Sequence, residues 1–119
     1  MKRTIALTAV VSSALTLLAV WSLGGAPVEE KVKLENIRVK ITEVTAPVGS
    51  ARERHIRGRD QVIVFLDDCR YERIDSKTGQ KTVRERKSGD VIWHDRAEDA
   101  PKLINAGDKP YRSLLIEIK

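Results

Sequence analysis

The sequence lacks the residues that cross-link very small domains and those that stack against nucleic-acid bases. Its one cysteine, Cys69, excludes a disulfide within the chain, so a hydrophobic core must stabilise the fold. Only four aromatic residues follow residue 26, too few and too scattered to stack a series of bases. They are Phe65, Tyr71, Trp93 and Tyr111. We interpret Cys69 as a small strand residue, with an intermolecular disulfide or a reactive thiol as the alternative.

An excess of one charge is also missing. The chain has a formal net charge of +5, which becomes +3 after residue 26, where 20 basic and 17 acidic residues remain. Basic and acidic residues alternate, as in Arg52-Glu53-Arg54, which is typical of a solvated mixed surface. We therefore expect no nucleic-acid partner.

One long hydrophobic run is present. Residues 4–23 carry no charge and follow the basic pair Lys2-Arg3, which predicts a signal peptide or membrane anchor over residues 1–26. Small residues near Gly24 permit cleavage, but Pro27 disfavours a cut after Ala26, and 20 apolar residues also suffice to span a bilayer. Both outcomes stay open. We expect a periplasmic or secreted domain, anchored on the outer side of the membrane through residues 4–23 if the segment is not cleaved.

After residue 26 the sequence pattern predicts mainly strands. Residues 27–33 are charged and predict a tether, and residues 34–119 predict one domain. The strict alternation of 37–42 indicates a strand with one solvated face, whereas the apolar run 61–66 indicates a strand buried on both faces. Lys81–Lys87 predicts an exposed edge strand protected by charge. About seven or eight short strands without helical periodicity predict an all-β sandwich or barrel.

Turn residues separate these strands. The segments that predict turns are 46–50, Asp67-Asp68, 75–80, Ser88-Gly89-Asp90 and 105–110. Adjacent carboxylates point apart and suit a turn, so we do not interpret Asp67 and Asp68 as a catalytic pair.

Several segments, taken in order, are similar to those of a known family. They are Pro47-Val48-Gly49, His55, 60–68, 89–93, 105–108 and 111–119. Their order and spacing resemble a small single-domain cupin over roughly Leu34 to Lys119. The resemblance implies a compact cupin-like jelly-roll barrel, and such barrels are often homodimers.

Metal-binding cupins carry two motifs that supply four ligands, and the resemblance assigns their positions here. The first motif is Gly, five residues, His, one residue, His, three or four residues, Glu, six residues, Gly. Gly49 and His55 match it. The second His position holds Arg57, the Glu position holds Gln61, and the last Gly position holds Asp68.

The second motif departs further from the family pattern. Gly89 matches, but the Pro and Gly positions hold Asp95 and Ala97. The His position falls on Ala100, or on Pro101 if one inserted residue brings the Asn position into register with Asn105.

Of the four ligands that the resemblance implies, His55 alone is present. Arg57 would place a permanent cation at the metal position, so we expect no metal and no other cofactor. The remaining route to a metal site is recruitment of ligands from other positions, namely Glu53, Asp60, His94 and Glu98.

His55, Arg57 and Gln61 form our candidate ligand-binding set. If no bulge intervenes, all three share one face of a strand, which in a barrel would be the interior. They would then provide fixed hydrogen bonds for a carboxylate or a similar anion. The alternative is a solvated loop over 52–59 whose charges pair locally with Glu53 and Asp60.

His94 and Trp93 each have a structural and a functional interpretation. His94 is interpreted as a surface histidine rather than a general base, because no nucleophile or paired carboxylate accompanies it in sequence. Trp93 is interpreted as a core residue rather than a ligand platform.

Three functions remain open from the sequence. The first is an exported, metal-free module that binds a small ligand such as an anion, or acts as an accessory domain. The second is a metal-dependent enzyme of the oxygenase or isomerase type. The third is a membrane-tethered protein-interaction domain. We expect the first, with no catalytic residues assigned, because fold alone does not establish an activity.

Overall fold

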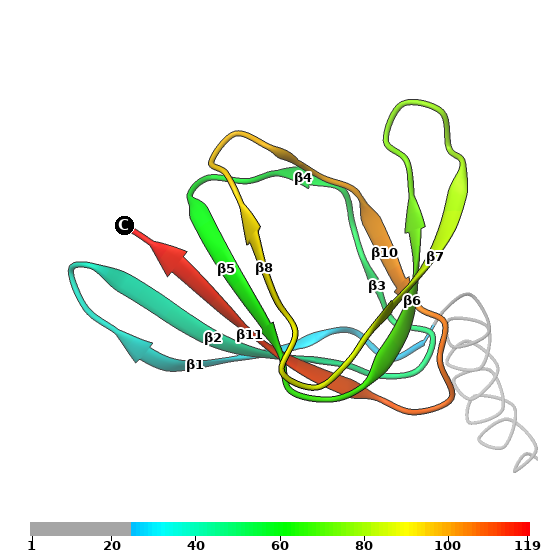
Figure 1. Ribbon diagram of the computed structural model, residues 1–119, viewed down its shortest axis with the longest axis horizontal. Coiled ribbons are helices and arrows are strands. Elements are labelled where there is room, and N and C mark those ends of the chain that lie inside the picture. Colours follow the sequence, from blue (N-terminus) through cyan, green and yellow to red (C-terminus); the bar gives the residue numbers. More distant parts are fainter. Residues whose placement is uncertain (1–24) are drawn as a thin grey trace, which may run out of the picture.

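The computed structural model describes residues 25–119, so the segment interpreted as a signal peptide or anchor lies almost wholly outside the described residues. Residues 25–119 form strands joined by turns and contain no α-helix (Figure 1), which confirms the all-β class. The strands are β1 (Glu29–Glu35), β2 (Val39–Ala46), β3 (Ala51–Arg52), β4 (His55–Ile56), β5 (Asp60–Phe65), β6 (Cys69–Ile74), β7 (Lys81–Arg86), β8 (Val91–His94), β9 (Asp99–Ala100), β10 (Lys102–Asn105) and β11 (Tyr111–Ile118). No helix among these residues is long and apolar enough to cross a membrane.

The strands form two larger sheets that face each other. One sheet has the order β1-β2-β11-β5-β8 and the other β3-β10-β6-β7, while β4 and β9 pair separately (Figure 1). The sheets are not closed into a barrel, so the prediction of a jelly-roll barrel is confirmed only as a sandwich of facing sheets. Seven or eight strands was an underestimate, because three of the eleven strands are only two residues long.

The first strand begins earlier than the sequence indicated. Residues 29–35 form β1, which pairs antiparallel with β2 from Glu29↔Thr45 to Glu35↔Lys40. The tether predicted over 27–33 is therefore wrong for residues 29–33. The charged residues of this segment suit an exposed edge strand, and all seven residues of β1 are exposed.

Strand register separates an inner from an outer face of the five-stranded sheet. In β5, Gln61 and Phe65 are buried and face the other sheet, whereas Val62 and Val64 point outward and are half-buried. The prediction that β5 is buried on both faces is therefore wrong for its outer face. Val62 pairs with Trp93, whose side chain is 52% exposed. Trp93 is thus an outer-face residue, and its assignment to the core was wrong.

An aromatic cluster forms the core at one end of the sandwich. The rings of Phe65, Tyr71 and Tyr111 lie with their centroids 6.3–6.5 Å apart, and buried Ala46 completes the cluster. These residues come from β2, β5, β6 and β11, so the cluster joins both sheets. Aromatic pairs at this spacing stabilise a core beyond their buried area.

The half-buried Cys69 packs against this cluster. Burial raises the pKa of its thiol to about 11, so the thiol stays protonated at neutral pH. This favours the small strand residue over the reactive thiol.

The predicted turns are confirmed and are stabilised by their own side chains. Asp75 Oδ2 accepts hydrogen bonds from the backbone N–H groups of Lys77 and Thr78, at 3.0 and 2.8 Å. Before β8, Gly89 has a φ of +94°, a conformation that favours glycine. Its N–H donates to the carbonyl of Phe65 at 2.7 Å, which ties the turn to the end of β5.

The Asp67-Asp68 pair is structural, as the sequence indicated. Asp67 accepts two hydrogen bonds from the Arg112 guanidinium, both of 3.0 Å. Asp68 Oδ1 accepts from the backbone N–H of Ser88 at 2.8 Å. These contacts join the loop after β5 to β11 and to the turn before β8.

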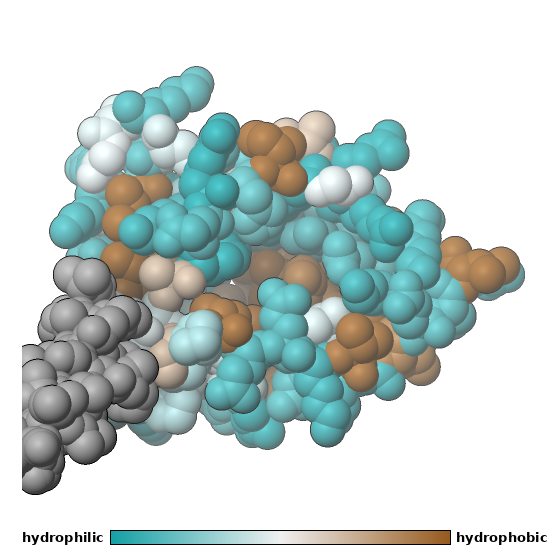
Figure 2. Space-filling view, turned by 180° about the vertical axis from the view of Figure 1, so that it is seen from behind, coloured by the Kyte–Doolittle hydropathy of each residue, from teal (hydrophilic) through white to brown (hydrophobic). Residues whose placement is uncertain are grey.

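The molecule is hollowed between its sheets. Figure 2 shows a recess near the centre of the face seen from behind, with hydrophobic residues in its depth and hydrophilic residues around it. Hydrophobic residues elsewhere on this face lie apart from one another among hydrophilic ones.

We expect Asp67→Asn to lower the melting temperature by about 2–4 °C at pH 7, because it weakens the ion pair with Arg112. The hydrogen bond from Arg112 holds the pKa of Asp67 below its usual 3.8, so the stabilisation is present above that pH and is lost as pH falls through the lowered pKa. Thermal melts from pH 7 down to the lowered pKa test this. Asp108→Asn is the control, since the Asp108 carboxylate makes no hydrogen bond among residues 25–119. An equal loss at every pH would contradict the assignment.

Candidate functional site

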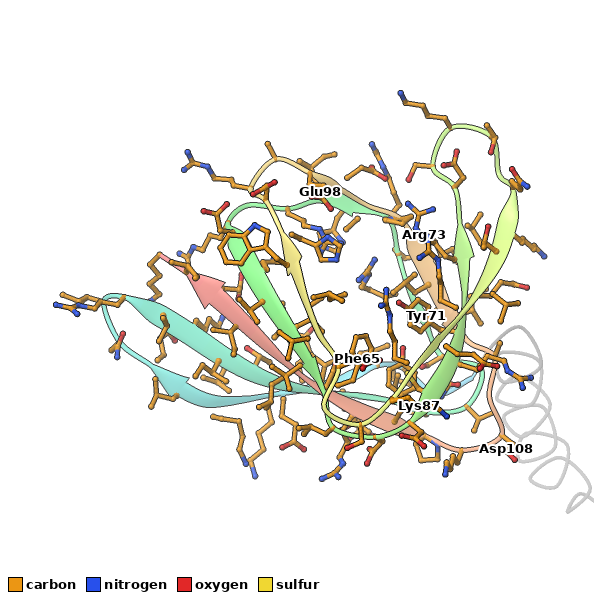
Figure 3. All side chains as sticks on the ribbon, viewed as in Figure 1. Phe65, Tyr71, Arg73, Lys87, Glu98 and Asp108 are labelled. Carbon is orange, nitrogen blue, oxygen red and sulfur yellow. The ribbon has the colours of Figure 1, made fainter. Side chains whose placement is uncertain are left out.

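Five arginine side chains line a cavity of about 200 Å³ between the two sheets. They are Arg52, Arg57, Arg73, Arg84 and Arg86. The cavity lies beside the aromatic core, and Phe65 and Tyr71 form part of its wall. In Figure 3, Phe65, Tyr71 and Arg73 lie in the space between the sheets, with Glu98 at its edge.

Strand alternation explains why three of the arginines point inward from one sheet. On β6, Tyr71 and Arg73 share the inner face, while Arg70 points outward and lies 3.5 Å from Glu85. Register pairs Tyr71 with Arg84, which places Arg84 and Arg86 of β7 on the same inner face. Arg86 donates from Nε to the hydroxyl of Tyr71 at 3.2 Å and lies 5.7 Å from the Phe65 ring centroid.

Arg57 and Gln61, two residues of the predicted set, are brought together. Arg57 is only 5% exposed, as is Gln61, and Arg57 Nη1 donates to Gln61 Oε1 at 2.9 Å. Arg57 lines the cavity, whereas Gln61 holds its guanidinium in place. Arg57 Nε is buried and has no hydrogen-bond partner among the described residues.

Arg52 is half-buried and lines the same cavity. Its Nη2 donates to the carbonyl of Pro101, and its Nε is buried without a partner in the described part of the chain. Burial, followed by the charge of Arg57, lowers the pKa of Arg52 to about 10. Burial also lowers the pKa of Arg57, against the opposing influence of Glu98 and Asp99. Both groups remain cations at neutral pH, and neither forms an ion pair within residues 25–119.

The cavity is strongly electropositive. Five guanidinium groups and two carboxylates, Glu98 and Asp99, line it, which leaves a formal charge of +3 when His94 is neutral. Within residues 25–119 none of the five arginines forms an ion pair. Asp99 pairs instead with the outer Arg54, at 2.6 Å. Like charges held together without partners are unfavourable unless an anion joins them.

The solvated-loop alternative is therefore wrong for Arg52 and Arg57. Arg54 is exposed, as that alternative predicted, but it pairs with Asp99 rather than with Glu53 or Asp60. The backbone fold explains the difference. The chain leaves β4 after Ile56, and the Arg57 N–H donates to the Glu98 carbonyl at 3.0 Å, which turns the Arg57 side chain inward.

His55, the third predicted site residue, does not join Arg57 and Gln61. It is exposed, and its Nδ1 lies 3.2 Å from the carbonyl of Glu53. It lines a neighbouring cavity together with Arg52. The assumption of one continuous strand was wrong, because β4 and β5 are separate and the chain bends between them.

His94 is not the isolated surface histidine that the sequence suggested. It is half-buried at the cavity wall, and its Nδ1 lies 2.5 Å from Glu98 Oε2. This hydrogen bond lowers the pKa of Glu98. Its carboxylate partner Glu98 is four residues away, because the turn after β8 folds back on itself.

Four site residues were not predicted from the sequence: Arg52, Arg73, Arg84 and Arg86. Lys81–Lys87 was interpreted as an exposed edge strand, and it is indeed the edge strand of its sheet. The overlooked signal was the shared parity of Arg84 and Arg86 across the hairpin from Tyr71, which is buried.

The residues of this cavity do not fit a divalent cation. Its wall offers one imidazole and two carboxylates against five guanidiniums, and His94 and Glu98 are bonded to each other. Among residues 25–119 no group of three His, Cys, Asp or Glu side chains is arranged to hold a metal ion.

A wider depression of about 430 Å³ lies outside the sandwich, between the β6–β7 hairpin and the loop before β11. The residues that line it include Arg70 and Glu85, which pair with each other. Because its charges are matched in this way, it is a weaker candidate than the interior cavity.

Comparison with known proteins identifies the fold. No protein-family model and no curated protein matches the sequence. A cupin domain from Bordetella pertussis matches with a TM-score of 0.70 at 22% identity, over 78% of this chain and 94% of that one. A cupin superfamily protein from Desulfitobacterium hafniense gives 0.59 at 15%, over 76% of each chain. The polyketide cyclase RemF from Streptomyces resistomycificus gives 0.61 at 17%, over 76% of this chain and 64% of that one. Identities this low establish a fold and leave the activity open.

We expect Gln61→Leu to destabilise the protein by about 1–3 kcal/mol, because it removes the acceptor of the buried Arg57 guanidinium. The double variant Arg57→Leu/Gln61→Leu should recover most of the lost free energy of unfolding, because it also removes the buried guanidinium that Gln61→Leu leaves without its acceptor. Urea unfolding measures both. Gln80→Leu, in the exposed β6–β7 loop, is the matched control and should change little. A double variant no more stable than Gln61→Leu would contradict the pairing.

Proposed function

We propose that this cupin-fold domain binds a small organic or inorganic anion in the arginine-lined cavity and does so without a metal. One observation carries the proposal. Five guanidinium groups converge on one cavity, and none of them has a carboxylate partner within residues 25–119. A bound carboxylate or phosphate would supply the missing counter-charge.

The donor geometry supports an oxyanion rather than a halide. Guanidinium groups present planar pairs of N–H donors that match the two oxygens of a carboxylate or phosphate. Arg52 and Arg57 each have a buried Nε–H without an acceptor, so each has an N–H donor ready for a ligand oxygen. An oxyanion placed between them would satisfy both donors.

Gln61 and His55 take different places in this proposal. Gln61 positions Arg57 through the 2.9 Å hydrogen bond and need not touch the ligand. His55 belongs to the neighbouring cavity and contributes nothing to the oxyanion site itself. The binding set predicted from sequence is thus retained for Arg57, supplemented by the other four arginines.

We expect millimolar phosphate, succinate or citrate to raise the melting temperature of the protein relative to chloride at the same ionic strength. Binding to the folded state alone stabilises by about 2.7 kcal/mol at a ligand concentration a hundredfold above Kd. Arg73→Gln, on the inner face of β6, should reduce the rise. Without an oxyanion, Arg73→Gln should itself raise the melting temperature, because it relieves repulsion among the arginines.

Arg70→Gln is the matched control, because Arg70 lies on the outer face of the same strand. It should leave the response to oxyanions unchanged. If Arg70→Gln reduces the response as much as Arg73→Gln, the anions act on the surface and the proposal fails.

An acid–base enzyme is the second candidate, and the His94–Glu98 contact favours it. An imidazole oriented by a carboxylate at the wall of a ligand cavity can accept a proton from a bound substrate. Solvent deuterium incorporated into a bound carboxylate, detected by NMR and lost in His94→Gln, would support this role. If none of the oxyanions that bind exchanges a proton for solvent deuterium, only the binding function is supported.

We also propose that the domain acts outside the cytoplasm. The support is the uncharged segment 4–23 after two basic residues, which lies outside the described residues. Alkaline phosphatase fused after Lys119 should be active in an exporting bacterium, because that enzyme requires disulfides that form after export. A fusion lacking residues 2–24 is the control and should be inactive. Equal activity of both fusions would contradict export.

A further inference from the structure

A second cavity adjoins the arginine-lined one inside the sandwich. It has a volume of about 300 Å³ and lies between β1, β2 and β11 on one side and β3 and β10 on the other. Arg52 and Leu103 line both cavities, so they form the boundary between two compartments of one interior. The recess in Figure 2, with hydrophobic residues in its depth, agrees with such an interior.

The two compartments differ in chemistry. Both have apolar residues in their walls, but the first carries five guanidinium groups, whereas the only charged residues that line the second are Arg52 and Glu30 when His55 is neutral. The apolar residues of the second are Val28, Val44, Ala46, Leu103, Tyr111 and Leu115. Strand alternation produces this wall, because Val44 and Ala46 share the inner face of β2, and Leu115 lies on the inner face of β11 opposite Thr42.

Arg52 lies at the boundary between the two compartments and has an N–H donor without an acceptor in the described part of the chain. Its Nη2 donates to the Pro101 carbonyl, while its Nε is buried without a partner in the described part of the chain. A cation beside an apolar compartment suits an anionic group whose hydrocarbon part extends away from it. The second compartment also contains Ser50, which is 2% exposed and whose Oγ has no partner among residues 25–119.

The geometry points to an amphipathic organic anion as the ligand, with its carboxylate or phosphate among the arginines and its hydrocarbon body in the second compartment. This inference rests on the proposed anion-binding function and specifies its ligand class. Arg52 and Arg57 bind the head, and Val44 and Leu115 contact the body. Ser50 Oγ offers one hydrogen bond to a polar substituent on that body.

The dimensions of the interior agree with this ligand class. Binding cavities for small molecules usually begin near 300 Å³, roughly the size of the apolar compartment alone. The arginine compartment of about 200 Å³ has room for a charged head group. A ligand that fills both compartments would cover the apolar wall and neutralise the arginines together.

The experiment is a calorimetric titration of the full chain with linear alkyl carboxylates from ethanoate to decanoate, each below its micelle concentration. We expect Kd to fall about three- to fourfold for each added methylene until the compartment is full, and then to level off. Methyl NOEs between octanoate and Val44 or Leu115 in the unmodified protein give a second measurement that needs no variant.

Variants separate the head from the body. Arg52→Gln should weaken every carboxylate in the series. Val44→Phe fills the apolar compartment and should remove the gain with chain length while short carboxylates still bind. Val64→Phe, half-buried on the outer face of β5, is the matched control and should alter neither.

The outcomes distinguish this inference from the function on which it rests. If ethanoate and octanoate bind equally well, or if no NOE reaches Val44 or Leu115, the amphipathic ligand is wrong and the anion site stands. If no carboxylate binds at any length but phosphate still raises the melting temperature, the amphipathic ligand is wrong and the anion site stands, whereas the anion site fails as well if phosphate has no effect. A chain-length gain that survives Val44→Phe would assign the body to another surface and overturn the inference.

Discussion

Like-charged guanidinium groups repel one another, and water normally screens that repulsion. This domain places five of them around one interior cavity, two of them largely withdrawn from water. The two sheets cannot close over such a surface as they close over apolar side chains. The aromatic residues Phe65, Tyr71 and Tyr111 pack together at one end of the sandwich. The arginines between the sheets thus account for both the open space and the small core.

The same constraint relates the cavity to its fold family. The sequence resemblance to metal-binding cupins implies a histidine and a glutamate at the motif positions held here by Arg57 and Gln61. Here Gln61 accepts a hydrogen bond from Arg57, and the pair occupies the buried position with a fixed cation. In the proposed function the N–H donors of the arginines would both attract an anion and set its orientation. The division between an arginine compartment and an apolar one gives the interior a direction along which an amphipathic ligand would lie.

Local patterns predicted much of the strand framework. Turns at 75–80, 88–90 and 105–110 were recognised from residues whose side chains bond the backbone or tolerate a positive φ. Those preferences act over a few residues and need no distant partner. Errors arose where exposure depends on a neighbouring strand. Trp93 was assigned to the core because it is large and apolar, yet nothing among residues 25–119 covers the outer face of β8 at that point.

The sequence by itself determined the all-β class, the turns and the presence of a fixed cation at Arg57, because these follow from residue type and short-range spacing. Tertiary structure alone decided which arginines converge. The hairpin register brings Arg84 and Arg86 to the face of Tyr71, and the bend after β4 separates His55 from Arg57. The tertiary structure also placed Glu98 in contact with His94. Pairing across strands fixes such distances, and a one-residue shift in register would reverse every inward side chain.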